Sequence, residues 1–258
     1  MIIDAHLHLD DTEGRTVMEA AIELDRQLKQ AGIIRAIVLH LEKQPWSFKE
    51  FSLAIASFPR LRGFINIHPA NPKAIANLHE GIKELGFIGL KLHPRLQEFE
   101  VDHALTIELV KEAGKLGIPV LFDAFPDGTH LMQGFSPLKY AKLAKECHQT
   151  KIIWAHMGGH YVLDFLMLAK RLPNVYMDIS YSLLYYQTSS VVDDIVYALR
   201  SLKFERVFYG SDYPDRPIEI SLNSSLEILK QKGLSKLELE KLTATNAIDF
   251  FKWEDLKL

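Results

Sequence analysis

Short runs of apolar residues alternate along the whole chain with longer stretches in which apolar positions recur every three or four residues. The first pattern predicts buried strands and the second predicts amphipathic helices, so the alternation indicates repeated β–α units around a parallel sheet. Eight strands are expected, at Ile2–Leu9, Ile33–Leu41, Leu61–His68, Phe87–His93, Ile118–Phe122, Lys151–His156, Val175–Ser180 and Arg206–Asp212.

The spacing of these runs favours a closed barrel over an open sheet. Their ends recur about every 30 residues, which is the length of one strand, one helix and their loops. An open doubly wound sheet usually stops at about five or six strands and has a Gly-rich first turn, which is missing here. With 258 residues in the chain, we expect residues 1–258 to form a single-domain α/β fold, a (β/α)8 TIM barrel.

Two helical stretches follow the eighth expected strand, at Glu219–Lys232 and Ser235–Phe251. The second begins with Ser235 and has Glu238 three residues later, which is the pattern of a capping box. We therefore expect an additional C-terminal helix that covers the barrel.

The overall charge of the chain bears on its partners. The composition is 48% hydrophobic and 24% charged, with a net charge of −3. These values are typical of a globular protein, and the chain lacks the excess of positive charge that would attract phosphate backbones. The balance disfavours nucleic acid and favours a small-molecule substrate.

Cysteine usage and the N-terminal residues give an expectation about the compartment. The single cysteine, Cys147, excludes an internal disulfide and a cysteine-based metal cluster. The first residues do not have the pattern of a signal peptide, and the sequence has no apolar run long enough to span a membrane. We expect a cytoplasmic protein with no membrane partner.

The first expected strand contains two closely spaced histidines. Side chains in a strand alternate between faces, so Asp4, His6 and His8 point the same way, which in a barrel can be inward. Neutral imidazoles are good ligands for zinc and similar ions, and two of them would then converge on one metal. Histidines that hydrogen-bond within the core or at the surface are the alternative for this short pattern.

The positions of other polar residues strengthen the metal interpretation. Six of the 11 histidines, at positions 6, 8, 40, 68, 93 and 156, lie at or near the C-terminal ends of expected strands, where barrel active sites are built. Asp212 ends the eighth strand, so closure of the barrel brings it beside the first. It would supply an anionic ligand or a base that takes a proton from activated water.

Further candidates end the fourth and sixth strands. His156 precedes Gly158 and Gly159, and its alternative role is that of a helix-capping histidine. Lys91 and His93 share one strand face, and an inward lysine is costly unless it is paired, modified or bound to a substrate charge. His68 is a candidate to fill the mouth of the barrel.

The motifs together resemble the amidohydrolase superfamily, in particular the amidohydrolase-related branch that includes aminocarboxymuconate semialdehyde decarboxylase. The resemblance covers nearly the whole chain and implies a metal-dependent barrel enzyme. It implies that His6, His8 and Asp212 are metal ligands, and that His156 is a ligand or the general acid/base. The segments that carry it are Ile3–His8, Gly89–Pro94, Ala155–Gly159, Asn174–Ser180, Tyr209–Pro214 and Thr245–Ala247.

The fifth strand departs from the family pattern. The family usually ends this strand with a histidine ligand, whereas here Pro119–Phe122 runs into Asp123. A carboxylate binds zinc at a similar distance, so we expect Asp123 to take the place of the histidine, with one Zn²⁺ bound or a shift toward Mn²⁺. The extra negative charge would leave the bound water less acidic. Loss of the metal, and a carbamylated Lys91 bridging two metals, are the alternatives.

These observations predict a metal-dependent hydrolase that acts on a small metabolite. The expected metal ligands are His6, His8, Asp123, His156 and Asp212, and the expected catalytic residues are His156, Asp212 and Lys91. Lys91, His93, Arg95 and His68 are expected to bind substrate. The alternatives are a non-oxidative decarboxylase or hydratase, a metal-dependent nuclease or phosphoesterase on a similar barrel, and a non-catalytic metabolite-binding barrel. A homodimer is expected from the resemblance alone.

Overall fold

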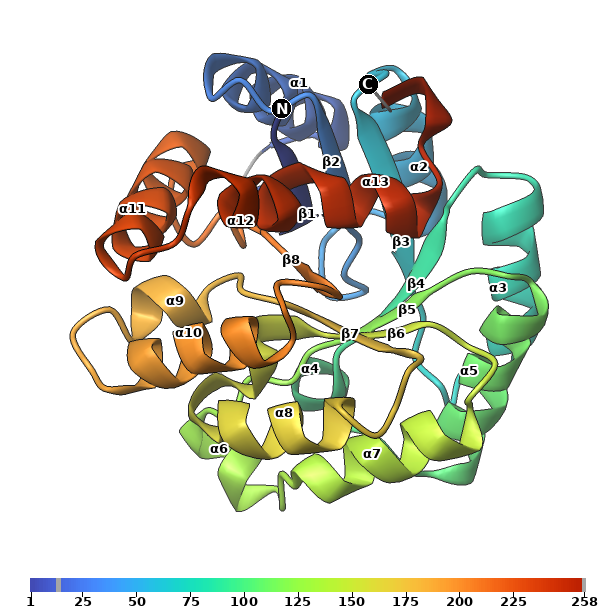
Figure 1. Ribbon diagram of the computed structural model, residues 1–258. Coiled ribbons are helices and arrows are strands. Elements are labelled where there is room, and N and C mark those ends of the chain that lie inside the picture. The colour runs from blue at the N-terminus through green and yellow to red at the C-terminus, as the bar shows by residue number, and fades with distance from the viewer. Residues whose placement is uncertain (13–14, 257–258) are drawn as a thin grey trace.

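The fold is a barrel of eight parallel strands in which each strand pairs with its neighbours in chain order (Figure 1). The structure is a computed structural model that describes residues 1–12 and 15–256. It confirms the expected (β/α)8 architecture. The strands are β1 (Ile3–Leu7), β2 (Arg35–Leu39), β3 (Leu61–Asn66), β4 (Gly89–Leu92), β5 (Val120–Phe122), β6 (Ile152–Trp154), β7 (Val175–Asp178) and β8 (Val207–Phe208).

Backbone hydrogen bonds between β1 and the segment that begins at β8 close the barrel. The Ala5 amide donates to the Tyr209 carbonyl at 2.9 Å, and the Asp212 amide donates to the His6 carbonyl at 2.9 Å. The His8 amide then donates to the Tyr213 carbonyl at 2.8 Å. This closure brings Asp212 beside the two histidines, as the sequence predicted.

Several strands end earlier than the sequence predicted, and two of the polar residues expected at strand ends have a backbone conformation outside the β region. His156 has φ 62° and Asp212 has φ 56°, and this left-handed conformation cannot continue a β-ladder. The predicted helix at Ser235–Phe251 is likewise interrupted by a π-helical turn at Lys241–Thr245.

Helices surround the strands (Figure 1). Three of them begin with the capping boxes of Thr16, Ser47 and Ser235. Within the described part of the chain, no helix combines the length and apolar character needed to cross a lipid bilayer. The α-helices are α1 (Val17–Gln30), α2 (Phe48–Ala56), α3 (Ala74–Lys83), α4 (Pro94–Gln97), α5 (Ala104–Lys115), α6 (Gly128–Met132), α7 (Pro137–Glu146), α8 (Val162–Ala169), α9 (Ser182–Tyr185), α10 (Val191–Ser201), α11 (Ile218–Gln231), α12 (Lys236–Glu240) and α13 (Asn246–Phe251); Ala155–Tyr161 and Glu254–Leu256 are 3₁₀ segments.

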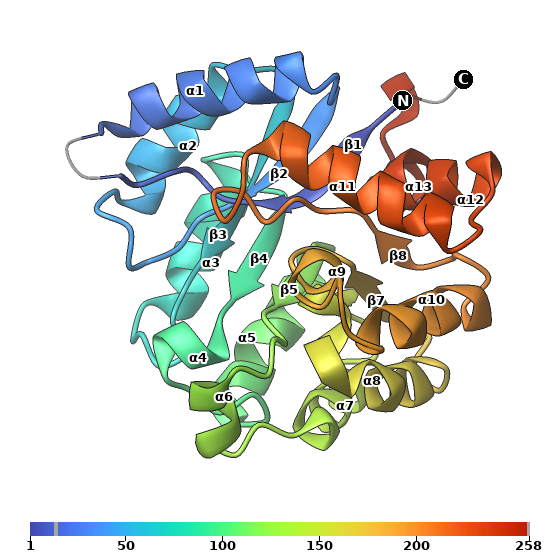
Figure 2. The same ribbon diagram turned by 90° about the vertical axis from the view of Figure 1, so that its left-hand side faces the viewer.

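The C-terminal helix α13 covers one end of the barrel. Its Ile248 and Phe250 belong to the same apolar cluster as the strand residues Ile3, Phe64 and Ile153. Figure 2 shows α13 and the N-terminal end of the chain on one side, while α4 and α6, which follow β4 and β5, lie on the other. The N-terminal ends of the strands are therefore plugged by apolar side chains, and their C-terminal ends remain available for a site.

Gly89 leaves space inside the barrel for an aromatic ring. A Cβ at this position would lie 2.4 Å from a ring carbon of Phe64, whose side chain is fully buried. Lys91 follows two residues later on β4. The glycine therefore lets the Phe64 ring pack against β4 inside the barrel, two residues before Lys91.

Candidate active site

A cavity of about 350 Å³ lies at the C-terminal ends of the strands. It brings together all of the predicted site residues except His68. The lining residues are His6, His8, Leu41, Lys91, His93, Arg95, Leu96, Asp123, Phe125, Asp127, His156, Tyr181, Tyr185, Asp212, Pro214 and Asp215. His6 on β1 and Lys91 on β4 thus meet side chains from the segments that follow β1, β2, β4, β5, β6, β7 and β8.

His6, His8 and Asp212 form a compact cluster. Asp212 Oδ1 lies 3.2 Å from His6 Nε2 and 3.7 Å from His8 Nε2. The other ring nitrogens are anchored by acceptors, because His8 Nδ1 lies 2.9 Å from the Leu39 carbonyl and His6 Nδ1 lies 3.0 Å from an Asp178 carboxylate oxygen. Each neutral ring then carries its hydrogen on Nδ1, so both Nε2 lone pairs face a carboxylate. Lone pairs facing one another in this way need a proton or a metal ion between them, and the three atoms lie within 4.8 Å of one another, close enough to ligate one ion.

Asp123 forms a second group with His156 and His93. Its Oδ1 lies 3.3 Å from His156 Nε2, and its Oδ2 lies 3.5 Å from His93 Nδ1. His156 Nδ1 is held 3.0 Å from the Ser180 carbonyl, so its Nε2 also faces a carboxylate. Asp123 Oδ2 is buried without a hydrogen-bond partner in the described residues. The structure therefore places Asp123 beside His156, outside the compact cluster, and its role as a ligand stays a prediction.

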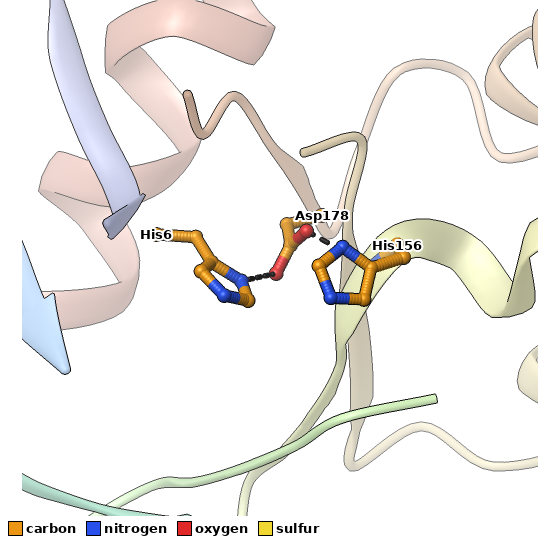
Figure 3. Close-up of side chains that lie close together, drawn as sticks. All are labelled: His6, His156 and Asp178. Atoms are coloured by element: carbon orange, nitrogen blue, oxygen red, sulfur yellow. Dashed lines mark hydrogen bonds and ion pairs between the residues drawn. The ribbon is translucent and has the colours of Figure 1, made fainter. Parts of the chain in front are cut away.

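Asp178 connects the two groups, and the sequence reasoning did not include it among the site residues. Its Oδ2 contacts His6 Nδ1, and its Oδ1 accepts a hydrogen bond from the His156 amide at 3.0 Å (Figure 3). Ser180 Oγ lies 3.2 Å from His6 Nδ1 and 3.0 Å from His156 Nδ1. The signal that could have identified Asp178 is an acidic residue at the end of an otherwise apolar strand.

Opposing charges keep the two carboxylates ionised. Burial acts to raise the pKa of Asp212, but the charge of His6 and its hydrogen bond hold that pKa well below the ordinary range. Burial likewise opposes ionisation of Asp123, but its interactions with His93, His156 and Lys91 together hold its pKa well below the usual value. Burial lowers the pKa of His8 to about 3, so its imidazole is neutral. An anionic oxygen and a neutral imidazole are the forms that bind a divalent metal.

The His6 imidazole lies between two carboxylates. Burial and the charge of Lys91 act to lower its pKa. The charges of Asp178 and Asp212 outweigh them and raise this pKa to about 9. In the absence of a metal, the ring therefore takes up a proton between the two carboxylates. A divalent ion would compete with this proton for Nε2.

Lys91 is the buried cation of the cavity, with 1% of its surface exposed. Within the described residues its Nζ has no hydrogen-bond or ion-pair partner, and burial lowers its pKa. Arg95 lies nearer the mouth, where its Nη1 contacts Asp127 Oδ2 at 2.8 Å. An anionic group entering the cavity would meet both positive charges.

The structure places His68 outside this cavity. It lines a neighbouring hollow, and its Nε2 lies 2.8 Å from the Gln97 carbonyl. Its Nδ1 accepts a hydrogen bond from the Ala70 amide at 3.0 Å. Both ring nitrogens are thus engaged with the backbone, which leaves none for a substrate in the metal-site cavity.

Comparisons with known proteins agree on the fold. A search of curated protein sequences finds no match. A probable 2-pyrone-4,6-dicarboxylic acid hydrolase from Acinetobacter baumannii, solved with citric acid, is 17% identical with a TM-score of 0.71 over 97% of this chain and 99% of that one. An amidohydrolase from Burkholderia multivorans with bound zinc is 13% identical, with a TM-score of 0.69 over 98% and 99% of the two chains.

A third solved structure is a decarboxylase. The 5-carboxyvanillate decarboxylase from Novosphingobium aromaticivorans, complexed with manganese and 4-hydroxy-3-methoxy-5-nitrobenzoic acid, is 14% identical, with a TM-score of 0.67 over 98% of this chain and 96% of that one. At these identities the likenesses show the fold alone. The family profile described as Amidohydrolase matches residues 3–253, which confirms the predicted family, and the chain therefore belongs to the amidohydrolase family of enzymes.

Proposed function

We propose that this protein is a metal-dependent hydrolase of a small metabolite that carries a carboxylate. The observation that carries the proposal is the convergence of two histidine Nε2 atoms on Asp212 inside a cavity. The zinc bound by one structural relative and the manganese bound by another support a divalent ion at this position.

The donor set fits such an ion. His6, His8 and Asp212 would hold it, with His156 or Asp123 completing the set from the adjacent group. Two imidazoles with one or two carboxylates suit zinc, and the second carboxylate makes the set harder and favours manganese. A divalent ion held there supplies a Lewis acid and a nucleophilic water at neutral pH.

The side chains of the cavity have separate roles in the proposed hydrolysis. Asp212 is ionised and can accept the proton of the attacking water. His156 can pass that proton to the leaving group, because its Nε2 faces the cavity while Ser180 holds Nδ1. Lys91 and Arg95 are the cations that would bind the substrate carboxylate, and His93 would contact the substrate beside them.

Non-oxidative decarboxylation is the second candidate. The fold is shared with a 5-carboxyvanillate decarboxylase, and the buried charge of Lys91 would also stabilise an anion that develops as carbon dioxide leaves. Hydrolysis needs the scissile bond at the metal site, whereas decarboxylation needs the carboxylate that leaves to be held there. They differ in whether water enters the product.

The test combines metal content with two assays. Purified protein and a His6→Ala variant are compared by inductively coupled plasma mass spectrometry, and about one zinc or manganese per chain is expected in the wild type alone. The loaded protein is then given 2-pyrone-4,6-dicarboxylate, whose ring opening is followed by ultraviolet absorbance, and 5-carboxyvanillate, whose loss of carbon dioxide is followed separately. Hydrolysis that a chelator abolishes supports the proposal, whereas release of carbon dioxide alone selects the second candidate. Protein that stays metal-free after incubation with zinc and manganese contradicts both.

A further inference from the structure

Tyr181, in the loop after β7, has a backbone conformation that L-amino acids rarely adopt. Its φ is 57° and its ψ is −60°, and the Ser182 amide donates to the Ser180 carbonyl across it. These features define a three-residue γ-turn of the strained kind. A non-glycine residue keeps such a conformation only when its surroundings enforce it, and such sites cluster where function needs them.

Contacts on both sides of the turn enforce this conformation. The Ser180 carbonyl lies 3.0 Å from His156 Nδ1, and Ser182 Oγ donates to the His156 carbonyl at 2.7 Å. The Ser180 amide donates to Asp178 Oδ1 at 3.1 Å. The turn is therefore fastened to His156 and Asp178, which belong to the candidate active site.

The side chain that the turn presents lies in the wall of the cavity. The Tyr181 ring is perpendicular to Phe125 with centroids 4.9 Å apart, is stacked on Tyr185 at 5.1 Å, and lies 6.0 Å from the His156 ring. Within the described residues its hydroxyl has no hydrogen-bond partner. Burial raises the pKa of this hydroxyl and the charges of Asp215 and, more weakly, Asp212 raise it further, so it remains a donor at neutral pH.

We propose that Tyr181 is a substrate-contacting residue, and that the strained turn at residues 180–182 serves to hold its hydroxyl in the cavity as a hydrogen-bond donor. The inference rests on the proposed function in one respect: the cavity is taken to be the substrate site. The turn joins Tyr181 to His156 through the hydrogen bonds of Ser180 and Ser182, so a substrate held by the hydroxyl would lie beside the proton-transfer group.

The strain is tested by stability. Tyr181→Gly and Tyr181→Ala lose the same ring, but only glycine adopts this conformation freely, so the Tm of the glycine variant is expected to be higher by about 2 to 8 °C. Tyr186 has ordinary backbone, with φ −96°, and supplies the matched pair. There, alanine is expected to be at least as stable as glycine. The same order of Tm values at both positions would overturn the strained turn.

The hydroxyl is tested by binding. Tyr181→Phe is compared with wild type by calorimetry against citrate, 2-pyrone-4,6-dicarboxylate and 5-carboxyvanillate, with metal content and Tm expected to stay unchanged. Loss of one hydrogen bond to a charged ligand is expected to weaken binding of at least one compound by about tenfold. Tyr186→Phe is the control, because that hydroxyl lies 3.1 Å from His160 Nδ1 and outside the cavity lining. No difference between wild type and Tyr181→Phe for any compound would overturn the assignment.

Turnover by the wild type separates the two proposals. If the wild type binds a compound more tightly than Tyr181→Phe but turns none of them over, the proposed hydrolase function fails and the role of Tyr181 stands. If the wild type turns a compound over and Tyr181→Phe matches its kcat/KM, the function stands and the role of Tyr181 fails.

Discussion

Replacing Asp178 by asparagine is expected to disable the metal site without disturbing the barrel. Asp178 Oδ1 accepts hydrogen bonds from the amides of His156 at 3.0 Å and Ser180 at 3.1 Å, which determines the orientation of the side chain. In Asp178→Asn the oxygen must stay there, so the amide nitrogen faces His6 Nδ1, 3.0 Å from the present oxygen. Two donors would then meet, and His6 must move its hydrogen from Nδ1 to Nε2. An Nε2 that carries hydrogen cannot ligate a metal.

The expected magnitude follows from this contact. Both side chains are buried, and removal of the partner that orients a metal-binding histidine typically weakens metal affinity about 10- to 100-fold. This is about 1.4 to 2.8 kcal/mol of binding free energy. The measurement is zinc affinity by competition with a chromogenic chelator, on protein whose Tm has been recorded first.

Asp4→Asn is the matched control. Asp4 is also fully buried on β1, but its Oδ1 accepts hydrogen bonds from the amides of His6 at 3.1 Å and Ser211 at 3.0 Å, and it touches no imidazole. An asparagine oxygen can accept both bonds, so zinc affinity should change by less than about threefold. Wild-type zinc affinity in Asp178→Asn, or an equal loss in both variants, would refute the tautomer argument.

Three other perturbations have defined outcomes. Gly89→Ala forces a Cβ to within 2.4 Å of the Phe64 ring, so it should destabilise the protein by about 1 to 3 kcal/mol in urea unfolding, and adding Phe64→Leu should recover part of that loss if the ring contact is the cause. Lys91→Met removes a buried charge that has no partner in the described residues, so the Tm of metal-loaded protein should rise. The KM of any carboxylate substrate should increase at least about tenfold. A lower Tm would show that Lys91 is paired with the carboxylates around it. Burial lowers the pKa of His40 from 6.5 to about 4. Between these two pH values the unfolded chain binds a proton at His40 that the folded protein does not. The free energy of unfolding should therefore fall by about 3 kcal/mol as the pH falls through this range. His40→Gln should flatten that dependence, and an unchanged slope would exclude His40 as its source.

The alternation of apolar runs was sufficient to predict the barrel, because each buried strand appears as a short apolar run and each helix as a stretch with apolar residues every three or four positions. His6, His8 and Asp212 were also predictable, since strand alternation and barrel closure bring them together without knowledge of any loop. The structure places His68 outside the cavity, and its position after β3 in the sequence did not indicate the backbone groups that engage both ring nitrogens.

Other parts of the site depend on three-dimensional detail that no sequence pattern records. The separation of Asp123 from the compact cluster arises from its contacts with His93 and His156, which come from different strands. The role of Asp178 depends on distances to groups far away in the chain. The turn at Tyr181 contains no glycine, so ordinary turn chemistry gave no signal for it.

The closure of the barrel between β1 and the segment after β8 sets the order in which the protein matures on the ribosome. His6 and His8 emerge first, but they meet Asp212 only after most of the chain has been synthesised. Before α13 has been synthesised, apolar side chains of the barrel interior such as Phe64 and Ile153 lack the cover that Ile248 and Phe250 provide, so the incomplete chain exposes apolar surface. A metal ion that needs His6, His8 and Asp212 together would therefore bind only after the barrel has closed.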